Sequence, residues 1–508
     1  MSASPAPPDS RTRVLVIGMD MGDAALIQRW IREGHLPNFG LLMREGSWWD
    51  LTSPAEVLHT STWPTFATGT HPGKHGVYYP FQPRPGAQQA QHVTANQYAA
   101  PVFWSLADVH GLRCLIYDLP ETFPSAGYKG RAIFEWGTWA WYGEQRSQPE
   151  GLLGELRSRF GSYPLKLEAT RLGLKFPNPA QLERRLRESI EHKSRSLQWL
   201  LGAEDWDLAV VGFCETHPAG HYLWPKNGSA DDPAERLQAV RSIYVALDGA
   251  LASLRQALPV GTAILIVSGD GVRPNHCGWH LLPDVLERLG YAVATTAAQS
   301  SRRGWSIRDL KNAVPPGLRR WIADHLPSRL RERINTAVEG AGLDWSKTRA
   351  FTLPTDLEGY IRINLKGREP EGVVAPGPEY RALCREIATR LEALANPATG
   401  RPAIRKVWLR DEVFAGPARE HLPDLIVTWE GSAPIAALSS PATGTIGRPS
   451  PDPRTGTHSP SAFLLASGTG FRAGSRGTGR LVDVAATVLE LLGVPADPGM
   501  DGRPLERH

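Results

Sequence analysis

Four uninterrupted apolar runs, each ending in polar residues, constrain the fold more than any other feature of the chain. They read "RVLVIGMD", "LRCLIYDLP", "DLAVVGFCETH" and "TAILIVSGDG". A short run that is apolar throughout predicts a strand buried on both faces, as in a parallel sheet covered by helices. Between the runs lie segments with helical spacing, such as "AALIQRWIREG" and "RSIYVALDGALASLRQAL". This alternation predicts an α/β fold with a central, mostly parallel sheet between helices.

The length of the chain bears on its division into domains. With 508 residues it exceeds the size at which one core stops growing, so we expect a large core plus an inserted smaller lobe. We assign the core to residues 11–295 and 441–508, a basic helical insert or cap to 296–345, and a smaller α+β lobe to 346–440. A solvated charged face is the simpler interpretation of the basic insert, and a cap for an anionic substrate is the alternative.

Composition excludes several classes of protein. The net charge of +4 comes without a basic block, so we expect no nucleic acid polymer as a partner. The first ten residues lack the pattern of a signal peptide, and no apolar stretch approaches the ~18 residues of a membrane span. Four scattered cysteines without a CxxC pair read as free thiols. We expect a soluble cytoplasmic protein, and the oligomeric state stays open.

Acids and imidazoles follow three of the predicted strands. Asp20 ends the first run, Glu215 and His217 end the third, and Asp270 ends the fourth. Ligands of open α/β sheets bind at the carboxyl ends of the strands, so these side chains should share one edge. A single Asp after a strand is more often a turn or cap residue, but three such strand ends favour a site.

Further candidates surround these strand ends. His221 lies four residues after His217, so both imidazoles can face one metal ion. His458 lies in a Gly/Ser/Thr loop just before an apolar strand. Arg273 follows the fourth strand and is a candidate phosphate clamp. Mixed imidazole and carboxylate ligands suit zinc, and manganese is the alternative.

The loop "AEVLHTSTWPTFATGTHPGKHG", residues 55–76, is dense in hydroxyl groups. Thr60, Ser61 and Thr62 precede a Trp-Pro pair, which is typical of a helix cap. One of these hydroxyls could instead be a nucleophile. A serine or threonine hydroxyl is weak at neutral pH unless a metal ion or a base lowers its pKa.

The order of these segments resembles the alkaline phosphatase superfamily, and within it the type I phosphodiesterase/nucleotide pyrophosphatase branch and its bacterial phosphohydrolase and phosphomutase relatives. The resemblance rests on "LPNFGLLMREG", "TWPTFATGTHPGKHG", "ETHPAGH", "GTHSPSAFLLASG" and the closing "DGRPL". It implies an alkaline phosphatase-like layered core and two divalent metal ions, usually zinc. It also implies hydrolysis of a small-molecule phosphate ester, of phosphodiester or nucleotide type, through a covalent phospho-enzyme.

The resemblance carries over to the metal ligands residue by residue. Asp20, His221 and His458 match the family pattern. His217 stands where the family usually has aspartate, and the family's S-D-H-G appears as "SGDG", so Asp270 takes the histidine position. The implied metal ligands are therefore Asp20, His217, His221, Asp270 and His458. These exchanges fit either a rearranged metal site or a degenerate one.

The nucleophile is less clearly marked. Counted back from Thr68-Gly69, the family spacing falls on His59 rather than on a hydroxyl. We favour Thr60 as the nucleophile, with Ser61 as an alternative and His59 as a further one that could instead bind a metal ion or act as a base. Two other functions stay open: a pseudoenzyme that binds a phosphorylated ligand without turnover, and a phosphoryl transferase or mutase.

Overall fold

The computed structural model describes most of the chain. The described residues are 12–83, 86–87, 90–93, 98–122, 127–137, 145–165, 178–225, 233–295 and 342–507. The predicted basic insert at 296–345 lies outside them except for its last four residues. Nothing in the structure therefore bears on the alternatives given for that insert.

A nine-stranded sheet forms the centre of the larger lobe. Its strands, in spatial order, are β21 (Ser475–Arg480), β2 (Ser47–Thr52), β20 (Ala462–Ser467), β9 (Ala263–Ser268), β1 (Val14–Met19), β8 (Leu208–Phe213), β5 (Cys114–Tyr117), β6 (Arg131–Phe134) and β7 (Arg146–Gln148). The four apolar runs become β1, β5, β8 and β9, which pair in parallel, whereas β20 and β7 run antiparallel to their neighbours. The predicted central, mostly parallel sheet is confirmed.

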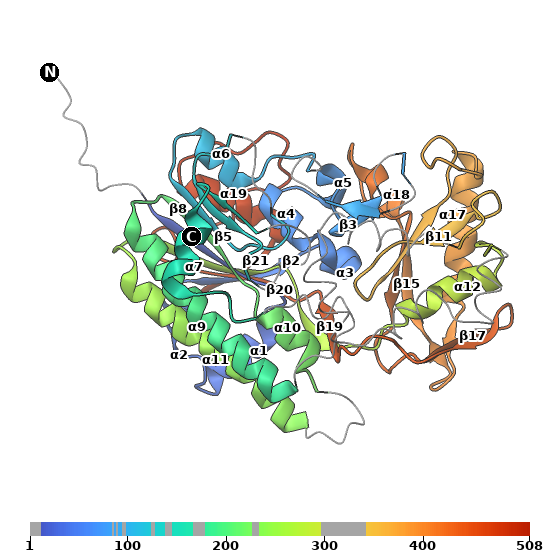
Figure 1. The fold of residues 1–508 in the computed structure, drawn as a ribbon, viewed down its shortest axis with the longest axis horizontal. Helices are drawn as coiled ribbons and strands as arrows, with labels where there is room; N and C mark the ends of the chain where they lie inside the picture. The colour runs from blue at the N-terminus through green and yellow to red at the C-terminus, as the bar shows by residue number, and fades with distance from the viewer. Residues whose placement is uncertain are drawn as a thin grey trace.

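Helices cover both faces of this sheet (Figure 1). On one face lie α1 (Ala24–Arg32), α2 (Pro37–Glu45), α9 (Pro179–Ala203) and α11 (Pro233–Ala257), and on the other lie α4 (Thr62–Thr68), α6 (Phe103–Val109) and α19 (Leu481–Leu491). Along β1, Leu15 and Ile17 pack into the first core, whereas Val14 and Val16 pack into the second. The strand is apolar throughout because both of its faces are buried.

A smaller lobe with its own core lies beside the sheet (Figure 1). Its antiparallel sheet has the order β11 (Ala350–Thr352), β12 (Gly359–Ile363), β16 (Leu425–Trp429) and β15 (Ile404–Leu409). A second sheet has the order β14 (Arg401–Pro402), β13 (Ala395–Asn396), β17 (Ala437–Ser440) and β18 (Gly444–Gly447). Helices α12 (Leu282–Arg288) and α17 (Pro378–Glu392) pack against these sheets. The predicted inserted lobe is thus present.

The chain enters and leaves the smaller lobe through a pair of strands. Strand β10 (Gly271–Pro274) leads out of the main sheet, and β19 (Gly456–Ser459) returns beside it in antiparallel register. This pairing places Val272 opposite His458. Segments nearly 200 residues apart in sequence therefore meet at the carboxyl end of β9.

The two lobes also meet at a close backbone contact. Helix α5 (Pro72–His75) carries Gly73, whose carbonyl oxygen accepts a 2.9 Å hydrogen bond from the Ala418 N–H of the smaller lobe. A Cβ atom on Gly73 would lie 2.2 Å from the Ala415 carbonyl oxygen, so only glycine allows this approach. All four cysteines are buried free thiols. Among the described residues, no helix is both long and apolar enough to cross a bilayer.

Candidate functional site

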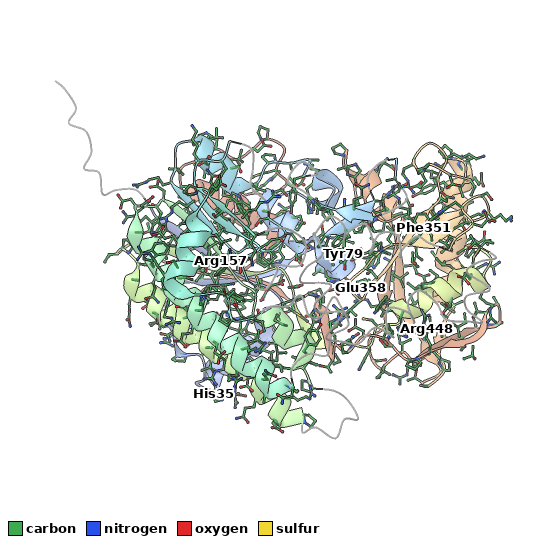
Figure 2. The ribbon with its side chains drawn as sticks, in the orientation of Figure 1. His35, Tyr79, Arg157, Phe351, Glu358 and Arg448 are labelled. Carbon is green, nitrogen blue, oxygen red and sulfur yellow. The ribbon has the colours of Figure 1, made fainter. Side chains whose placement is uncertain are left out.

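A pocket opens at the carboxyl ends of β1, β8 and β9, where the smaller lobe adjoins the main sheet. Figure 2 shows Tyr79, on the wall of this pocket, and Glu358 of the smaller lobe near the junction of the two lobes. The five residues that the sequence analysis proposed as metal ligands all line it: Asp20, His217, His221, Asp270 and His458. The structure thus brings together residues spread over most of the chain.

Two of these imidazoles lie on a short helix after β8. Helix α10 (Thr216–Tyr222) places His217 and His221 one turn apart, with their Nε2 atoms 3.0 Å from each other. The His221 Nδ1 lies 2.8 Å from the Gly456 carbonyl oxygen, which can only accept a hydrogen bond. Burial holds the pKa of both imidazoles well below the usual value, so both rings are neutral. A neutral imidazole can offer a lone pair to a metal ion.

His458 reaches the same point from β19. Its Nδ1 donates a 2.5 Å hydrogen bond to Asp270 Oδ2, and Asp270 Oδ1 accepts from the Met21 N–H at 3.1 Å. Burial alone would lower the pKa of His458, but the carboxylates of Asp270 and Asp356 outweigh it and raise that pKa to about 10. Asp270 therefore fixes the orientation of the ring, and the Nε2 atom faces the pocket.

Asp20 joins three elements around the pocket. Its Oδ1 accepts a 2.9 Å hydrogen bond from Trp63 Nε1 on α4, and its backbone carbonyl accepts one from the Thr216 hydroxyl at 2.5 Å. The Asp20 Oδ2 lies 3.8 Å from His217 Nδ1. Asp20 thus orients the first turn of α10 as well as lining the pocket.

Asp356 is a member of the site that the sequence analysis missed. It lies in the loop between β11 and β12 of the smaller lobe, yet its carboxylate lines the pocket of the larger lobe. One ligand atom from each of four residues, His217, His221, His458 and Asp356, lies within 4.8 Å of the others. Three imidazoles and a carboxylate form a donor set that suits zinc. The sequence around Asp356 carries no strand-end pattern that would have singled it out.

His59 faces the same cluster. It lies in a single 3-10 turn, η1 (His59–Ser61), and its ring stacks on that of His458 with centroids 4.2 Å apart. Both His59 ring nitrogens are buried without a hydrogen-bond partner among the described residues. Burial, with the charge of His458 adding to it, lowers the pKa of His59 to about 4, so the ring is neutral. The two nitrogens face Asp356 Oδ2 and Glu358 Oε1, each at 3.7 Å, which is too far for a hydrogen bond. A buried imidazole without a hydrogen bond is uncommon and points to a ligand or a substrate group.

The hydroxyl residues that follow His59 differ in their environments. The Thr60 hydroxyl lines the pocket, donates to the Tyr78 carbonyl oxygen and lies 2.9 Å from the Tyr360 hydroxyl. The Ser61 hydroxyl is buried, donates to the Val77 carbonyl at 2.7 Å and does not line the pocket. Helix α4 begins at Thr62, two residues after Thr60. Within the described part of the chain, Thr60 makes no hydrogen bond to the predicted metal ligands.

The two arginines near the pocket have different positions. Arg273, the predicted phosphate clamp, does not line the pocket, and its Nη2 lies 3.9 Å from Glu358 Oε1. Arg454 does line it and bonds to both Asp356 and Asp452. Arg454 is therefore the guanidinium that the structure places at the pocket, and the sequence analysis missed it.

Glu215 follows β8 as Asp20 follows β1, but its side chain is turned into the core. Its Oε1 accepts a 2.5 Å hydrogen bond from the Tyr163 hydroxyl and lies 3.5 Å from Lys193 Nζ. Lys193 is completely buried and also contacts Asp118 Oδ2 at 2.8 Å and the Gly212 carbonyl at 2.7 Å. Burial alone would lower the pKa of Lys193, but the two carboxylates hold it well above the usual value. These ion pairs hold Glu215, the residue directly before α10, against the buried face of α9.

A mostly parallel sheet whose carboxyl edge carries imidazoles, carboxylates and a nearby hydroxyl loop suits a metal-dependent hydrolase such as a phosphoesterase. The family model of type I phosphodiesterase / nucleotide pyrophosphatase matches residues 14–452. The chain therefore belongs to this family, and the resemblance to the alkaline phosphatase superfamily and the expectation of a phosphodiesterase-type enzyme are confirmed. No protein of curated function matches the sequence.

Solved structures share the fold at low sequence identity. Phosphonoacetate hydrolase from Sinorhizobium meliloti 1021, in complex with phosphonoformate, is 13% identical, with 95% of this chain and 96% of that chain covered and a TM-score of 0.51. Murine ectonucleotide pyrophosphatase / phosphodiesterase 5 is 14% identical, with 96% of both chains covered and a TM-score of 0.48. The likeness to the phosphonoacetate hydrolase confirms the predicted layered α/β core.

Proposed function

We propose that this protein hydrolyses a small-molecule phosphate ester, of phosphodiester or nucleotide type, with the help of a divalent metal ion. The observation that carries the proposal is the convergence of the His217, His221 and His458 rings with carboxylates in one pocket. The family of the chain supports phosphoester hydrolysis as the reaction.

The donor set of the pocket fits zinc, with manganese as the alternative. A bound divalent ion supplies charge stabilisation to phosphoryl oxygens in the transition state. The family resemblance implies two ions, and a second one would draw on Asp20 and Asp270, which line the same pocket. The ratio of bound metal to protein tests this prediction. Arg273 as phosphate clamp also stays a prediction.

We assign the role of nucleophile to Thr60. Its oxygen attacks phosphorus, and the hydroxyl proton leaves with the ester alcohol. Water then cleaves the bond between the threonine oxygen and phosphorus, which restores the hydroxyl and releases phosphate from a monoester substrate or the remaining phosphate monoester from a phosphodiester. Two features support the assignment: Thr60 lines the pocket, whereas Ser61 does not, and the Tyr360 hydroxyl lies 2.9 Å from the Thr60 oxygen, where it can hold the side chain in place. Burial keeps the pKa of Tyr360 well above its usual value, so Tyr360 stays a neutral donor.

The test is hydrolysis of bis-p-nitrophenyl phosphate by the full chain with added Zn²⁺ or Mn²⁺ and after removal of metal by a chelator. We expect turnover that depends on the metal. The substitution Thr60→Val should lower kcat by about 10³-fold or more, as loss of a nucleophile does. The matched control Ser61→Ala removes a buried hydroxyl bonded to the Val77 carbonyl and should keep turnover.

Other outcomes identify the alternatives. Activity in Thr60→Val together with its loss in His59→Ala would move the nucleophile to His59, where the family spacing falls. Binding of inorganic phosphate without turnover under any metal condition would show a pseudoenzyme. Transfer of the phosphoryl group to added glycerol in place of water would show a transferase.

A further inference from the structure

The carboxylate of Asp356 lies where a metal ion bound by the three imidazoles would need a fourth ligand. Its Oδ2 is 3.5 Å from His458 Nε2 and 3.9 Å from His221 Nε2. Four ligands at 2.0–2.1 Å from a tetrahedral zinc ion lie about 3.3–3.4 Å from one another. These two separations and the 3.0 Å between the two Nε2 atoms on α10 lie on either side of this value, and all four ligand atoms lie within 4.8 Å of one another. They are too long for hydrogen bonds between the carboxylate and the rings, but they suit an ion between them.

The outer nitrogens of the rings support the same arrangement. The Nδ1 atoms of His221 and His458 bond to the Gly456 carbonyl and to Asp270, and the Nδ1 of His217 faces Asp20. All three rings therefore turn Nε2 toward the cluster. Imidazoles that bind a metal ion use their second nitrogen in this way, because the hydrogen bond fixes the orientation of the ring.

The carboxylate of Asp356 is also bonded to an arginine. Arg454 bonds to its Oδ1, and Arg454 is anchored by Asp452 through a 2.6 Å hydrogen bond. Because Arg454 bonds to Oδ1, the Oδ2 atom of Asp356 is the oxygen that faces the imidazoles.

We propose that Asp356 is a ligand of the same divalent ion as His217, His221 and His458, so that this ion joins the smaller lobe to the main sheet. The proposal rests on the proposed function only for the presence of the ion. The main lobe supplies three imidazole nitrogens, and the smaller lobe supplies a carboxylate oxygen. Zinc accepts a fifth ligand, so a substrate oxygen can still reach it.

The experiment measures zinc binding to the full chain by competition with a chromophoric chelator, with bound metal counted after dialysis. The wild-type protein should bind zinc through this site, and Asp356→Asn should weaken that binding by about 100-fold or more. The matched control is Glu358→Gln, which removes a buried carboxylate two residues away that is not among the four clustered ligands. It should bind zinc as the wild type does.

Cobalt and heat provide readouts that a folding defect would not mimic. Co²⁺ bound to the wild type should give the intense visible absorption of a low-coordinate site, and Asp356→Glu, which shifts the carboxylate by one methylene, should change this spectrum. Zinc should raise the melting temperature of the wild type more than that of Asp356→Asn, because tighter binding to the folded state stabilises it more. Zinc affinity and cobalt spectra unchanged in both variants would overturn the proposal. If zinc binding depends on Asp356 but the protein hydrolyses no phosphate ester, the proposed function alone would be overturned.

Discussion

Replacement of Lys193 by methionine tests how the histidine-bearing helix is held. Lys193 lies on the buried face of α9, and its ammonium group pairs with Asp118 and Glu215 beneath the start of α10. The side chains of all three are at most 1% exposed. Lys193→Met keeps the apolar stem but leaves two carboxylates buried without a counter-charge.

The cost follows from the burial of the cluster. Removal of one partner from a buried ion pair destabilises a protein by about 3–5 kcal/mol. If the 508 residues melt as one unit, an unfolding entropy of ~2.1 cal/mol/K per residue gives about 1 kcal/mol per kelvin. The melting temperature should therefore fall by about 3–5 °C. Glu215 precedes α10 directly, so the affinity of the His217 and His221 pair for zinc should fall as well.

Thermal unfolding followed by circular dichroism at pH 7.5 measures the effect. The matched control is Arg195→Met, which removes one positive charge from an exposed position of the same helix and should change stability by less than ~0.5 kcal/mol. Adding Asp118→Asn and Glu215→Gln to Lys193→Met removes the unpaired charges and should recover part of the loss. A melting temperature of Lys193→Met within one degree of the wild type would refute the reasoning.

Two further predictions concern the loop that ends in "PGKHG". Burial lowers the pKa of His75 from 6.5 to about 3. As the pH falls, His75 binds a proton in the unfolded chain before it does so in the folded protein. Protonation of His75 should therefore lower the free energy of unfolding by about 2 kcal/mol between pH 7.5 and pH 5, at 1.36 kcal/mol per pKa unit. Denaturant unfolding at both pH values measures this change. The decrease in unfolding free energy from pH 7.5 to pH 5 should be about 2 kcal/mol smaller in His75→Gln than in the wild type. An equal decrease in both proteins would contradict the lowered pKa of His75. Gly73→Ala places a Cβ 2.2 Å from the Ala415 carbonyl and should cost about 1–3 kcal/mol, whereas Gly154→Ala, with open space at its Cβ, should not lower the melting temperature. Equal melting temperatures for the two alanine variants would contradict the close approach of the lobes.

The central sheet could be predicted because its signal is local. A strand covered on both faces has no polar position, so "RVLVIGMD" and "TAILIVSGDG" are recognisable without knowledge of their neighbours. The same reasoning placed Asp20 and Asp270 at one edge of the sheet, because parallel strands present their carboxyl ends together. Glu215 follows the same pattern but turns inward. The cause is Lys193, which interrupts the apolar stripe of α9 and needs a buried partner.

Asp356 could not be predicted because nothing near it in the sequence marks it. It follows a Thr after a proline in a loop of a different lobe, a context typical of a turn residue. Its place at the site depends on how the smaller lobe packs against the main sheet, through contacts such as that between Gly73 and Ala415. His59 was marked only by the family spacing, and its burial beside His458 needed the fold.

The distribution of charge around the pocket links the two lobes in function. His217, His221 and His59 are neutral because they are buried, so they offer lone pairs but no negative charge to a divalent ion. In the main lobe, Asp270 is engaged with His458 and with the Met21 N–H. The carboxylate of Asp356 therefore adds negative charge beside the imidazoles, and it does so only while the lobes are packed together. Gly73→Ala, which forces the lobes apart at a residue that does not line the pocket, should for this reason lower zinc affinity as well as stability. An unchanged zinc affinity in that variant would show that the contact at α5 does not set the position of Asp356.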